Sequence, residues 1–300
     1  MVIFGYRRAD HLEKVLRALA AEDLAKTTLC ILCLDGPKTP GEQRQIDRVR
    51  NVARADWGFG EIQIRAAKAN QGLVRSITSG VTDVCREHGQ AIVLEDDIVP
   101  RKGFLDFMNE ALEKYRDTPR VMQVSGYAYP VSAEPPRHSF LPLTSCWGWA
   151  TWQRAWQQYG WNPDLGRADL NNPDFLRRFD LQGAYPYSRL LRDVLEGKSD
   201  SWGVIWYWNV FRSGGLTLFP AQSLVDNIGW DGTGEHNEAH PLFQKSDVFP
   251  PEAKAAWPKE IQTSEDDLSR LFNLIRTSRK SNYAGPLRRL GKKIAPWLQF

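Results

Sequence analysis

The chain has 300 residues, of which 42% are hydrophobic and 25% are charged, and these proportions exclude a disordered or fibrous protein. The formal net charge of +3 is uneven, because residues 268–300 carry eight basic side chains and no acidic one, which leaves residues 1–267 at −5. A mildly acidic body argues against nucleic acid as a partner.

The first half of the sequence alternates predicted strands with predicted helices. Apolar runs predict strands at residues 2–5, 28–34, 62–64, 91–94 and 121–125. Helices are predicted after the N-cap Asp10, with Glu13 completing a capping box, and over residues 43–53, 74–88 and 104–115. This alternation predicts an α/β fold in which a mostly parallel sheet is flanked by helices.

The pattern changes after residue 130, where prolines interrupt regular structure. Four tryptophans occur within residues 147–156, and a predicted aromatic helix over 204–211 and a strand over 216–219 follow. We expect most tryptophans to build the core of the second half. Trp147 or Trp149 would contact a ligand, because Gly148 between them keeps that loop mobile and lets a ligand approach its backbone closely.

The cysteines and the hydropathy bear on cellular location. Four cysteines, Cys30, Cys33, Cys85 and Cys146, are too few for a disulfide framework in a chain of this length. Cys30 and Cys33 lie three apart in a predicted strand and therefore face opposite sides, which does not suit a metal or redox pair. The sequence shows neither a signal peptide nor a stretch long enough to span a bilayer. We therefore expect free thiols in a cytoplasmic protein.

Three consecutive carboxylates, Glu95-Asp96-Asp97, are the most informative feature of the sequence. They follow the apolar run 91–94, which predicts a buried strand, and unpaired charge is costly to bury. We place them at the carboxyl end of that strand, where open α/β sheets bind ligands. Adjacent carboxylates repel each other unless a cation neutralises them. The pattern favours a metal site for a phosphorylated ligand, and the alternatives are a solvated acidic turn or a cap on the next helix.

Four other short motifs accompany these carboxylates. They are Phe4-Gly5-Tyr6-Arg7-Arg8, Leu34-Asp35-Gly36, Asn70-Gln71-Gly72-Leu73 and Trp147-Gly148-Trp149-Ala150-Thr151-Trp152. In this order the motifs resemble those of bacterial nucleotide-sugar glycosyltransferases of the GT-A fold, of the family 2 type. The Glu-Asp-Asp variant also resembles N-acetylglucosaminyltransferase I. The resemblance covers about residues 1–240.

The resemblance implies a GT-A-like fold in which residues 1–130 bind the nucleotide sugar and residues 131–267 bind the acceptor. The uneven charge separately marks residues 268–300 as a basic tail. It implies an inverting transfer of a hexosyl or N-acetylhexosaminyl group, with Mn²⁺ or Mg²⁺ as cofactor. The donor is a nucleotide-diphosphate sugar, and the acceptor is a glycan or lipid-linked hydroxyl in bacterial surface-polysaccharide synthesis. Asp97 is the implied metal ligand. The implied donor-binding residues are Phe4, Tyr6, Arg7, Asp35, Asn70, Gly72, Glu95 and Asp96, to which we add Trp147 and Trp149.

Two later residues receive roles with alternatives. His236, in a glycine-rich loop, is the candidate second metal ligand, and Asp231 competes with it. Asp200 is the candidate catalytic base, because an inverting transfer needs a carboxylate across the sugar from the diphosphate, and Trp202 would partly desolvate it. The alternative for Asp200 is an N-cap of the helix near Trp202. Weaker candidates for the base are Asp169, Asp180 and Asp193.

Residues 282–300 combine apolar residues at near-helical spacing with basic ones, which suits an amphipathic helix on the inner face of the cell membrane. A disordered tail or a helix docked on the body is the alternative. Two other functions stay open. A sugar-phosphate nucleotidyltransferase would use the same acidic site, but its glycine-rich loop is reduced to one glycine in residues 5–10. A non-catalytic carbohydrate-binding protein would use the tryptophans and need no carboxylates.

Overall fold

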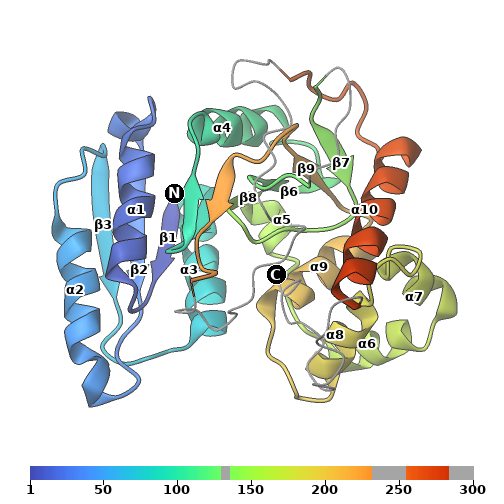
Figure 1. Ribbon diagram of the computed structural model, residues 1–300, viewed down its shortest axis with the longest axis horizontal. Coiled ribbons are helices and arrows are strands. Elements are labelled where there is room, and N and C mark those ends of the chain that lie inside the picture. Colours follow the sequence, from blue (N-terminus) through green and yellow to red (C-terminus); the bar gives the residue numbers. More distant parts are fainter. Residues whose placement is uncertain (130–135, 232–254, 284–300) are drawn as a thin grey trace.

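The computed structural model describes residues 1–129, 136–231 and 255–283, except for the side chains of 278–283. A sheet of eight strands crosses the centre of this part of the molecule (Figure 1). Its strands are β1 (Val2–Gly5), β2 (Leu29–Leu34), β3 (Glu61–Ala66), β4 (Gln90–Glu95), β6 (Val121–Ser125), β7 (Ser139–Leu141), β8 (Trp149–Trp152) and β9 (Leu216–Phe219). Their order is β3-β2-β1-β4-β8-β6-β9-β7. A separate two-stranded ladder joins β5 (Ile98–Pro100) to β10 (Val225–Asn227).

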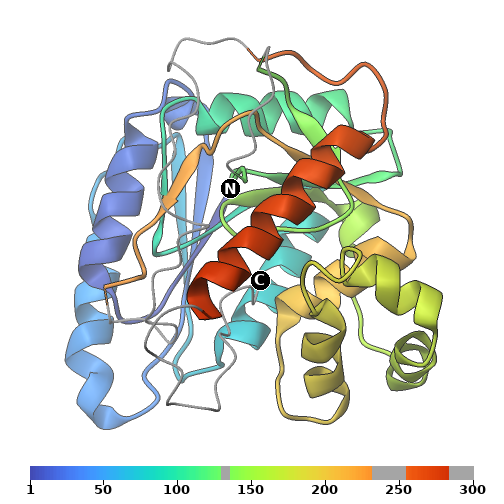
Figure 2. The ribbon, with the colours of Figure 1, turned by 45° about the vertical axis from the view of Figure 1, so that its right-hand side comes forward.

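Helices cover both faces of this sheet (Figures 1 and 2). Those in the described ranges are α1 (Ala9–Ala20), α2 (Gln43–Arg54), α3 (Leu73–His88), α4 (Phe104–Lys114), α5 (Gln153–Trp156), α6 (Pro163–Leu170), α7 (Pro173–Phe179), α8 (Tyr187–Leu195), α9 (Trp202–Arg212) and α10 (Glu265–Tyr283), with 3-10 turns η1 (Ala25–Thr27) and η2 (Pro40–Glu42). Helices α1, α2 and α4 pack on one face, and α3, α5 and one side of α9 pack on the other. The predicted α/β class is confirmed.

The two halves of the sheet differ in strand direction. β1 runs parallel to both of its neighbours, β2 and β4, and β2 runs parallel to β3. In β1 the side chains alternate between faces, so Val2 and Phe4 pack with α3 while Ile3 packs with α1. β8 is inserted antiparallel between β4 and β6, and β7 is antiparallel to β9. The predicted parallel arrangement therefore holds for β3-β2-β1-β4 and is interrupted in the second half.

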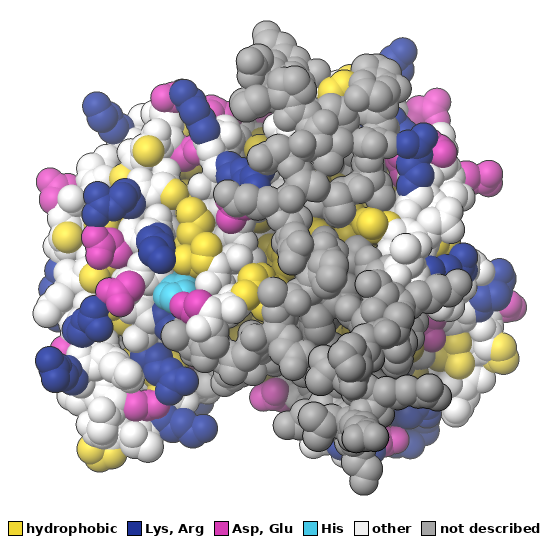
Figure 3. Space-filling model, in the orientation of Figure 1, with side chains coloured by type: hydrophobic (Ala, Val, Ile, Leu, Met, Phe, Trp, Pro, Cys, Tyr) yellow, Lys and Arg dark blue, Asp and Glu magenta, His cyan; other side chains and the backbone are white. Residues whose placement is uncertain are grey.

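The surface over α1 and α2 carries charges of both signs. Figure 3 shows basic and acidic side chains intermixed over these two helices, at the left of the view. Ion pairs join several of them, including Arg17 with Glu13 and Arg48 with Asp10. Such pairs bring charges of opposite sign together, so their charges cancel locally.

The inserted strand β8 belongs to the tryptophan-rich segment. All four of its residues are buried, so it lacks the alternation of polar and apolar residues by which a sequence indicates a strand. Trp149 stacks on Trp202 with ring centroids 5.5 Å apart and also packs against Trp156 and Trp206. These rings join β8 to α5 and α9. The expectation that most tryptophans build the core is confirmed.

The predicted N-cap of the first helix is wrong. α1 begins at Ala9 with Arg8 in the N-cap position, and no side chain caps it. Asp10 lies instead in the first turn, where a carboxylate is favoured by the helix dipole, and it pairs with Arg48 at 2.8 Å. The capping-box pattern is misleading here because the side chain of Arg8 is directed to Asp96 and Asp97, and the helix starts directly after it.

The predicted boundary at residue 268 falls inside one helix. α10 begins at Glu265 and lies against β7 (Figure 2), with Leu271 and Ile275 fully buried. Asp267 forms a bidentate ion pair with Arg137. The first part of the basic segment is therefore docked on the body. Residues 284–300, which carry most of the predicted amphipathic pattern, lie outside the described residues. Within the described part of the chain, no helix is both long and apolar enough to cross a bilayer.

Protonation of His138 should make the folded state depend on pH. Its ring packs between Phe107 and Trp257, at centroid distances of 4.9 and 4.7 Å, and burial lowers its pKa from 6.5 to about 4. Between these values the unfolded chain binds a proton that the folded state does not, so stability is full above pH 6.5 and falls as the pH drops. The test is to measure the free energy of unfolding with urea at pH 7.5 and at pH 5.0. The decrease between the two pH values should be about 1–2 kcal/mol smaller for His138→Gln than for the wild type.

The exposed His88 provides the matched control for this measurement. His88→Gln should leave the wild-type difference between the two pH values unchanged. A His138→Gln protein that loses as much stability at the lower pH as the wild type would contradict the assignment.

Candidate functional site

The carboxyl ends of the parallel strands gather polar side chains at one edge of the sheet. Tyr6, Arg7 and Arg8 follow β1, Asp35 follows β2, and the carboxylates of Asp96 and Asp97 follow β4. Because β1 pairs in parallel with both β2 and β4, these three segments leave the sheet side by side. We call this edge the acidic rim and define it by Glu95, Asp96 and Asp97. It is the edge at which open α/β sheets bind ligands.

Asp96 and Asp97 occupy the turn between β4 and β5. The two carboxylates are not helix caps, because β5 separates them from α4, whose N-cap is Gly103. The Asp96 side chain is 4% exposed and that of Asp97 is 17% exposed. The alternative of a solvated acidic turn is therefore also wrong, since both groups are largely enclosed.

Arg8 neutralises this pair of carboxylates, and sequence reasoning did not single it out. Its Nη2 atom lies 2.9 Å from Asp97 Oδ2 and also donates to Asp96 Oδ1. Burial alone would lower the pKa of the Arg8 guanidinium, but the charges of the two carboxylates outweigh burial and raise that pKa. Burial raises the pKa of the Asp96 carboxyl, the charge of Asp97 adds to this, and Arg8 opposes it. The one signal in the sequence is a pair of arginines directly after the first strand.

A segment from the second half of the chain closes over Asp97. β10 pairs with β5, and beyond it Ile228 donates its N–H to the carbonyl of Asp97 at 2.9 Å. A Cβ atom added to Gly229 would lie 2.4 Å from Asp97 Oδ2, so a glycine is required to keep the carboxylate in place. Asp231, the competing metal ligand, lies 3.2 Å from Nε2 of His11. His236 lies outside the described residues.

Asp35 organises the loop before α3. Its two carboxylate oxygens accept hydrogen bonds from the backbone N–H groups of Gly36, Gln71 and Gly72 and from the Asn70 side chain, at 2.8 to 3.1 Å. A carboxylate has about four acceptor positions, so these donors occupy them. Asp35, Asn70 and Gly72 are thus brought together after the carboxyl end of β2, and their predicted contacts with a donor stay a prediction. However, the carboxylate holds the loop, and a contact to base or ribose would have to displace one of these donors.

The residues that follow β1 divide between core and surface. Phe4 is 4% exposed and its ring packs against Gly80 of α3, so it supports the strand and presents no face to a nucleobase. The hydroxyl of Tyr6 donates to Glu42, and Arg7 pairs with the same carboxylate at 3.2 Å. Glu42, at the end of η2, was not predicted to take part. It connects the β1 loop to the segment after β2.

Trp147 and Trp149 differ in exposure although they are two residues apart. Because β8 is antiparallel to β4, the residues just before β8 lie beside the carboxyl end of β4. Trp147 lies there, half-buried, with edge-to-face contacts to Tyr127 and Trp230 at 4.9 and 5.9 Å. Trp149 is 1% exposed within the tryptophan core and has no ring face open to a ligand. Of the two candidates, only Trp147 is placed to contact a ligand at the acidic rim.

Asp200 lies in the loop that enters α9. It is exposed, so the desolvation expected from Trp202 is absent, and it does not cap the helix, because Ser201 does so through Val204 N–H. Trp202 stacks on Trp149 at the start of β8, which places Asp200 on the side of the molecule that carries the rim. Two of the three weaker candidates have structural partners: Asp169 accepts from Trp208 and pairs with Arg212, and Asp180 accepts from Ser188.

The carboxylates of the rim suit a metal ion that is held partly by its ligand. Within the described ranges, no group of three or more His, Cys, Asp or Glu side chains could enclose an ion. Mg²⁺ and similar ions commonly bind one or two carboxylates together with the phosphate oxygens of a substrate. Asp97, the more exposed of the buried acids, fits that mode of binding, provided that a ligand supplies the remaining oxygens.

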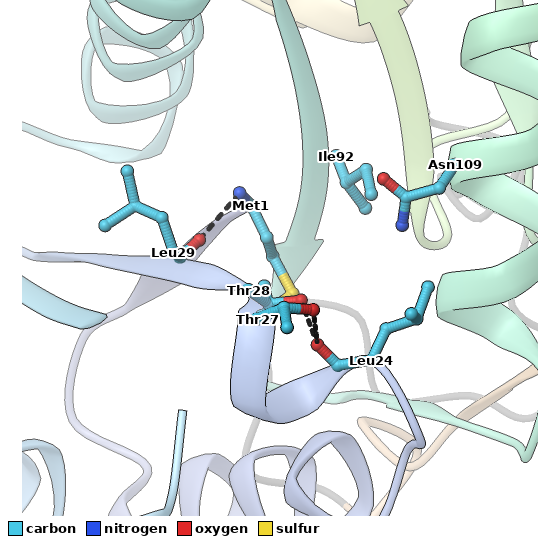
Figure 4. A pocket seen from close by; sticks show the side chains of 7 residues that line it. All are labelled: Met1, Leu24, Thr27, Thr28, Leu29, Ile92 and Asn109. Carbon is cyan, nitrogen blue, oxygen red and sulfur yellow. Dashed lines mark hydrogen bonds between the residues drawn. The ribbon is translucent and has the colours of Figure 1, made fainter. Parts of the chain in front are cut away.

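A pocket of about 400 Å³ lies at the opposite edge of the sheet, by the amino ends of β1 and β2 (Figure 4). It is lined by Met1, Leu24, Thr27, Thr28, Leu29, Ile92 and Asn109. Thr27 and Thr28 donate their hydroxyls to the carbonyl of Leu24. None of the lining side chains is charged, and the α-amino group of Met1 donates to the carbonyl of Leu29 at 2.9 Å.

The solved structures that resemble this chain do so only distantly, and three of them are described here. No family model and no curated protein matches the chain. Mouse xyloside xylosyltransferase 1 is 9% identical, covers 70% of this chain and 79% of its own, and has a TM-score of 0.34. Mannose-1-phosphate geranyltransferase from Thermus thermophilus is 13% identical over 77% of this chain and 76% of its own, with a TM-score of 0.35. The WbbM bifunctional glycosyltransferase is 12% identical over 99% of this chain and 46% of its own, with a TM-score of 0.31. Likenesses of this size do not bear on the chemistry.

Removing the Asp35 carboxylate should destabilise the protein strongly. Asp35→Ala leaves three backbone donors and the Asn70 amide without their acceptor at a site where Asp35 is 7% exposed. We expect a loss of about 2–4 kcal/mol in the free energy of unfolding, measured with urea. The exposed Asp47→Ala is the control and should change stability by less than about 0.5 kcal/mol. Equal stabilities of the two variants would refute the organising role of Asp35.

Proposed function

We propose that the chain is a glycosyltransferase that moves a sugar from a nucleotide-diphosphate donor to a hydroxyl of a glycan or lipid-linked acceptor. The observation that carries this proposal is the pair of enclosed carboxylates, Asp96 and Asp97, at the carboxyl end of β4 with Arg8 against them. Such a site combines a metal-binding carboxylate with a cation that can receive phosphate. The half-buried Trp147 at the same edge supplies an aromatic surface of the kind that sugars pack against.

Asp97 would hold Mn²⁺ or Mg²⁺ together with oxygens of the donor diphosphate. The bound ion would offset the negative charge that develops on the diphosphate as it leaves. Asp96 accepts a hydrogen bond from Arg8, and the loop that Asp35 holds would form the side of the donor site next to β2. The resemblance in sequence motifs supports the same arrangement and extends it to bacterial surface polysaccharide as the product.

Asp200 is the proposed base for an inverting transfer. The acceptor oxygen would attack the anomeric carbon, the bond from that carbon to the diphosphate oxygen would break, and the acceptor proton would pass to the Asp200 carboxylate. The base must lie across the sugar from the diphosphate, and Asp200 lies in the loop before α9, which is separate from the strands that carry the metal-binding acids. The Asp200 side chain is exposed, and a bound acceptor would cover it.

The first test is a thermal-shift screen of nucleotide-diphosphate sugars with and without MnCl₂. A ligand at about 100 times its Kd stabilises the native state by about 2.7 kcal/mol, and the cognate donor should do so only when Mn²⁺ is present. Asp97→Asn should abolish the metal-dependent part of the shift. If Asp97→Asn shows the same shift as the wild type, Asp97 is not the metal ligand, and if no nucleotide sugar binds the wild type, the function is wrong.

Gly229→Ala is a companion variant that changes no charged group. Its methyl group would displace the Asp97 carboxylate, so it should weaken the same Mn²⁺-dependent shift. Gly160→Ala is the matched control, because no atom lies within 4 Å of the added carbon.

The role of Asp200 is tested separately from donor binding. Asp200→Ala should lower kcat by about 10²-fold or more and leave the donor-induced thermal shift intact, because proton transfer to a positioned base contributes that much. Asp193→Ala, on the neighbouring helix α8, should retain turnover. Near-normal turnover by Asp200→Ala would place the base elsewhere.

A further inference from the structure

We propose that Arg8 is an internal counter-ion that competes with the divalent cation for Asp97 and is handed to the donor diphosphate when both ligands bind. This proposal rests on the proposed function and deepens it, because it states how the site remains assembled without ligand and why metal and donor should bind together.

The contacts of Arg8 differ from those of an ordinary surface ion pair. One nitrogen, Nη2, serves both Asp96 and Asp97, and the side chain is only 18% exposed. Arg7, the next residue, is 44% exposed and pairs with Glu42 instead. The chain therefore directs one of two consecutive arginines into the rim, at the residue from which α1 begins.

The two carboxylates are not equivalent toward a metal ion. Asp96 is 4% exposed and also faces the N–H of Tyr6, so it remains within the protein. Asp97 is 17% exposed and is the carboxylate that an ion from solvent can reach. An ion that binds Asp97 must share it with, or take it from, Arg8.

Charge decides when that exchange occurs. The three side chains in mutual contact, Asp96, Asp97 and Arg8, carry a net charge of −1. A divalent ion bound to them would reverse that charge where water is largely excluded, so binding of the metal alone is opposed. A diphosphate supplies the missing negative charge, and its oxygens accept hydrogen bonds from a guanidinium. Metal and diphosphate should therefore each raise the affinity for the other.

The test compares Mn²⁺ binding by the full-length protein with and without Arg8. Isothermal titration with MnCl₂ alone should show weak binding by the wild type and roughly ten-fold tighter binding by Arg8→Gln, because the carboxylates then lack a counter-ion. Arg8→Lys keeps the charge and should resemble the wild type. Adding inorganic pyrophosphate should raise the Mn²⁺ affinity of the wild type more than that of Arg8→Gln.

A matched ion pair in the second half provides the control. Arg137→Gln removes a guanidinium from the largely buried Asp267 and should not change Mn²⁺ affinity. If Arg8→Gln binds Mn²⁺ alone no more tightly than the wild type, the proposal is overturned, whether or not nucleotide sugars bind. If Arg8→Gln does not fold, the test uses Arg8→Lys, which keeps the positive charge. Tighter binding of Mn²⁺ alone by Arg8→Lys than by the wild type would refute the proposed competition of Arg8 with the metal for Asp97. Failure of every nucleotide sugar to bind the wild type is a different result, and it would refute the proposed function instead.

Discussion

Two adjacent carboxylates that are largely removed from water need a cation, and this requirement organises the site. Asp96 and Asp97 come to lie at the mouth of the sheet because β4 is buried up to Leu94 and the chain must turn there into β5. Arg8 meets both carboxylates because β1 is the parallel neighbour of β4. Arg8 is also the N-cap residue of α1, and its guanidinium, which has donors only, cannot cap that helix. A single electrostatic constraint thus connects the first strand, the first helix and the acidic turn.

The antiparallel strand β8 joins this rim to the second half of the protein. Its insertion next to β4 places Trp147 beside the carboxyl end of that strand and directs Trp149 into a core shared with α5 and α9. That core holds α9, and with it Asp200, on the rim side. The ladder of β5 with β10 then returns the chain over Asp97, where only a glycine fits at position 229. The rim is therefore built by segments more than 100 residues apart in the sequence.

Local sequence patterns predict a helix or strand correctly where the residues of that element alone decide its bounds. The helical periodicity of residues 74–88 and the glycine after them indicate α3 and its left-handed end at Gly89. Local patterns mislead where a distant partner decides. Asp10 has the spacing of a capping box, but the partner of Arg8 across the sheet sets the start of the helix. The glycine beside Trp149 suggests a ligand contact, whereas the tryptophans of α5 and α9 bury that ring.

The amino-acid sequence alone specifies the alternation of strands and helices, the parallel first half and the position of the acidic triplet at a strand end, because burial of apolar side chains and exclusion of charge act on short segments. The folded chain is needed to reveal that Arg8 neutralises the triplet, that Asp35 is occupied by its own loop and that residues 225–231 cover Asp97. Apart from the bond of Asp35 to its neighbour Gly36, these contacts join residues from 35 to more than 100 positions apart. No local spacing encodes the pairing of strands that brings them together.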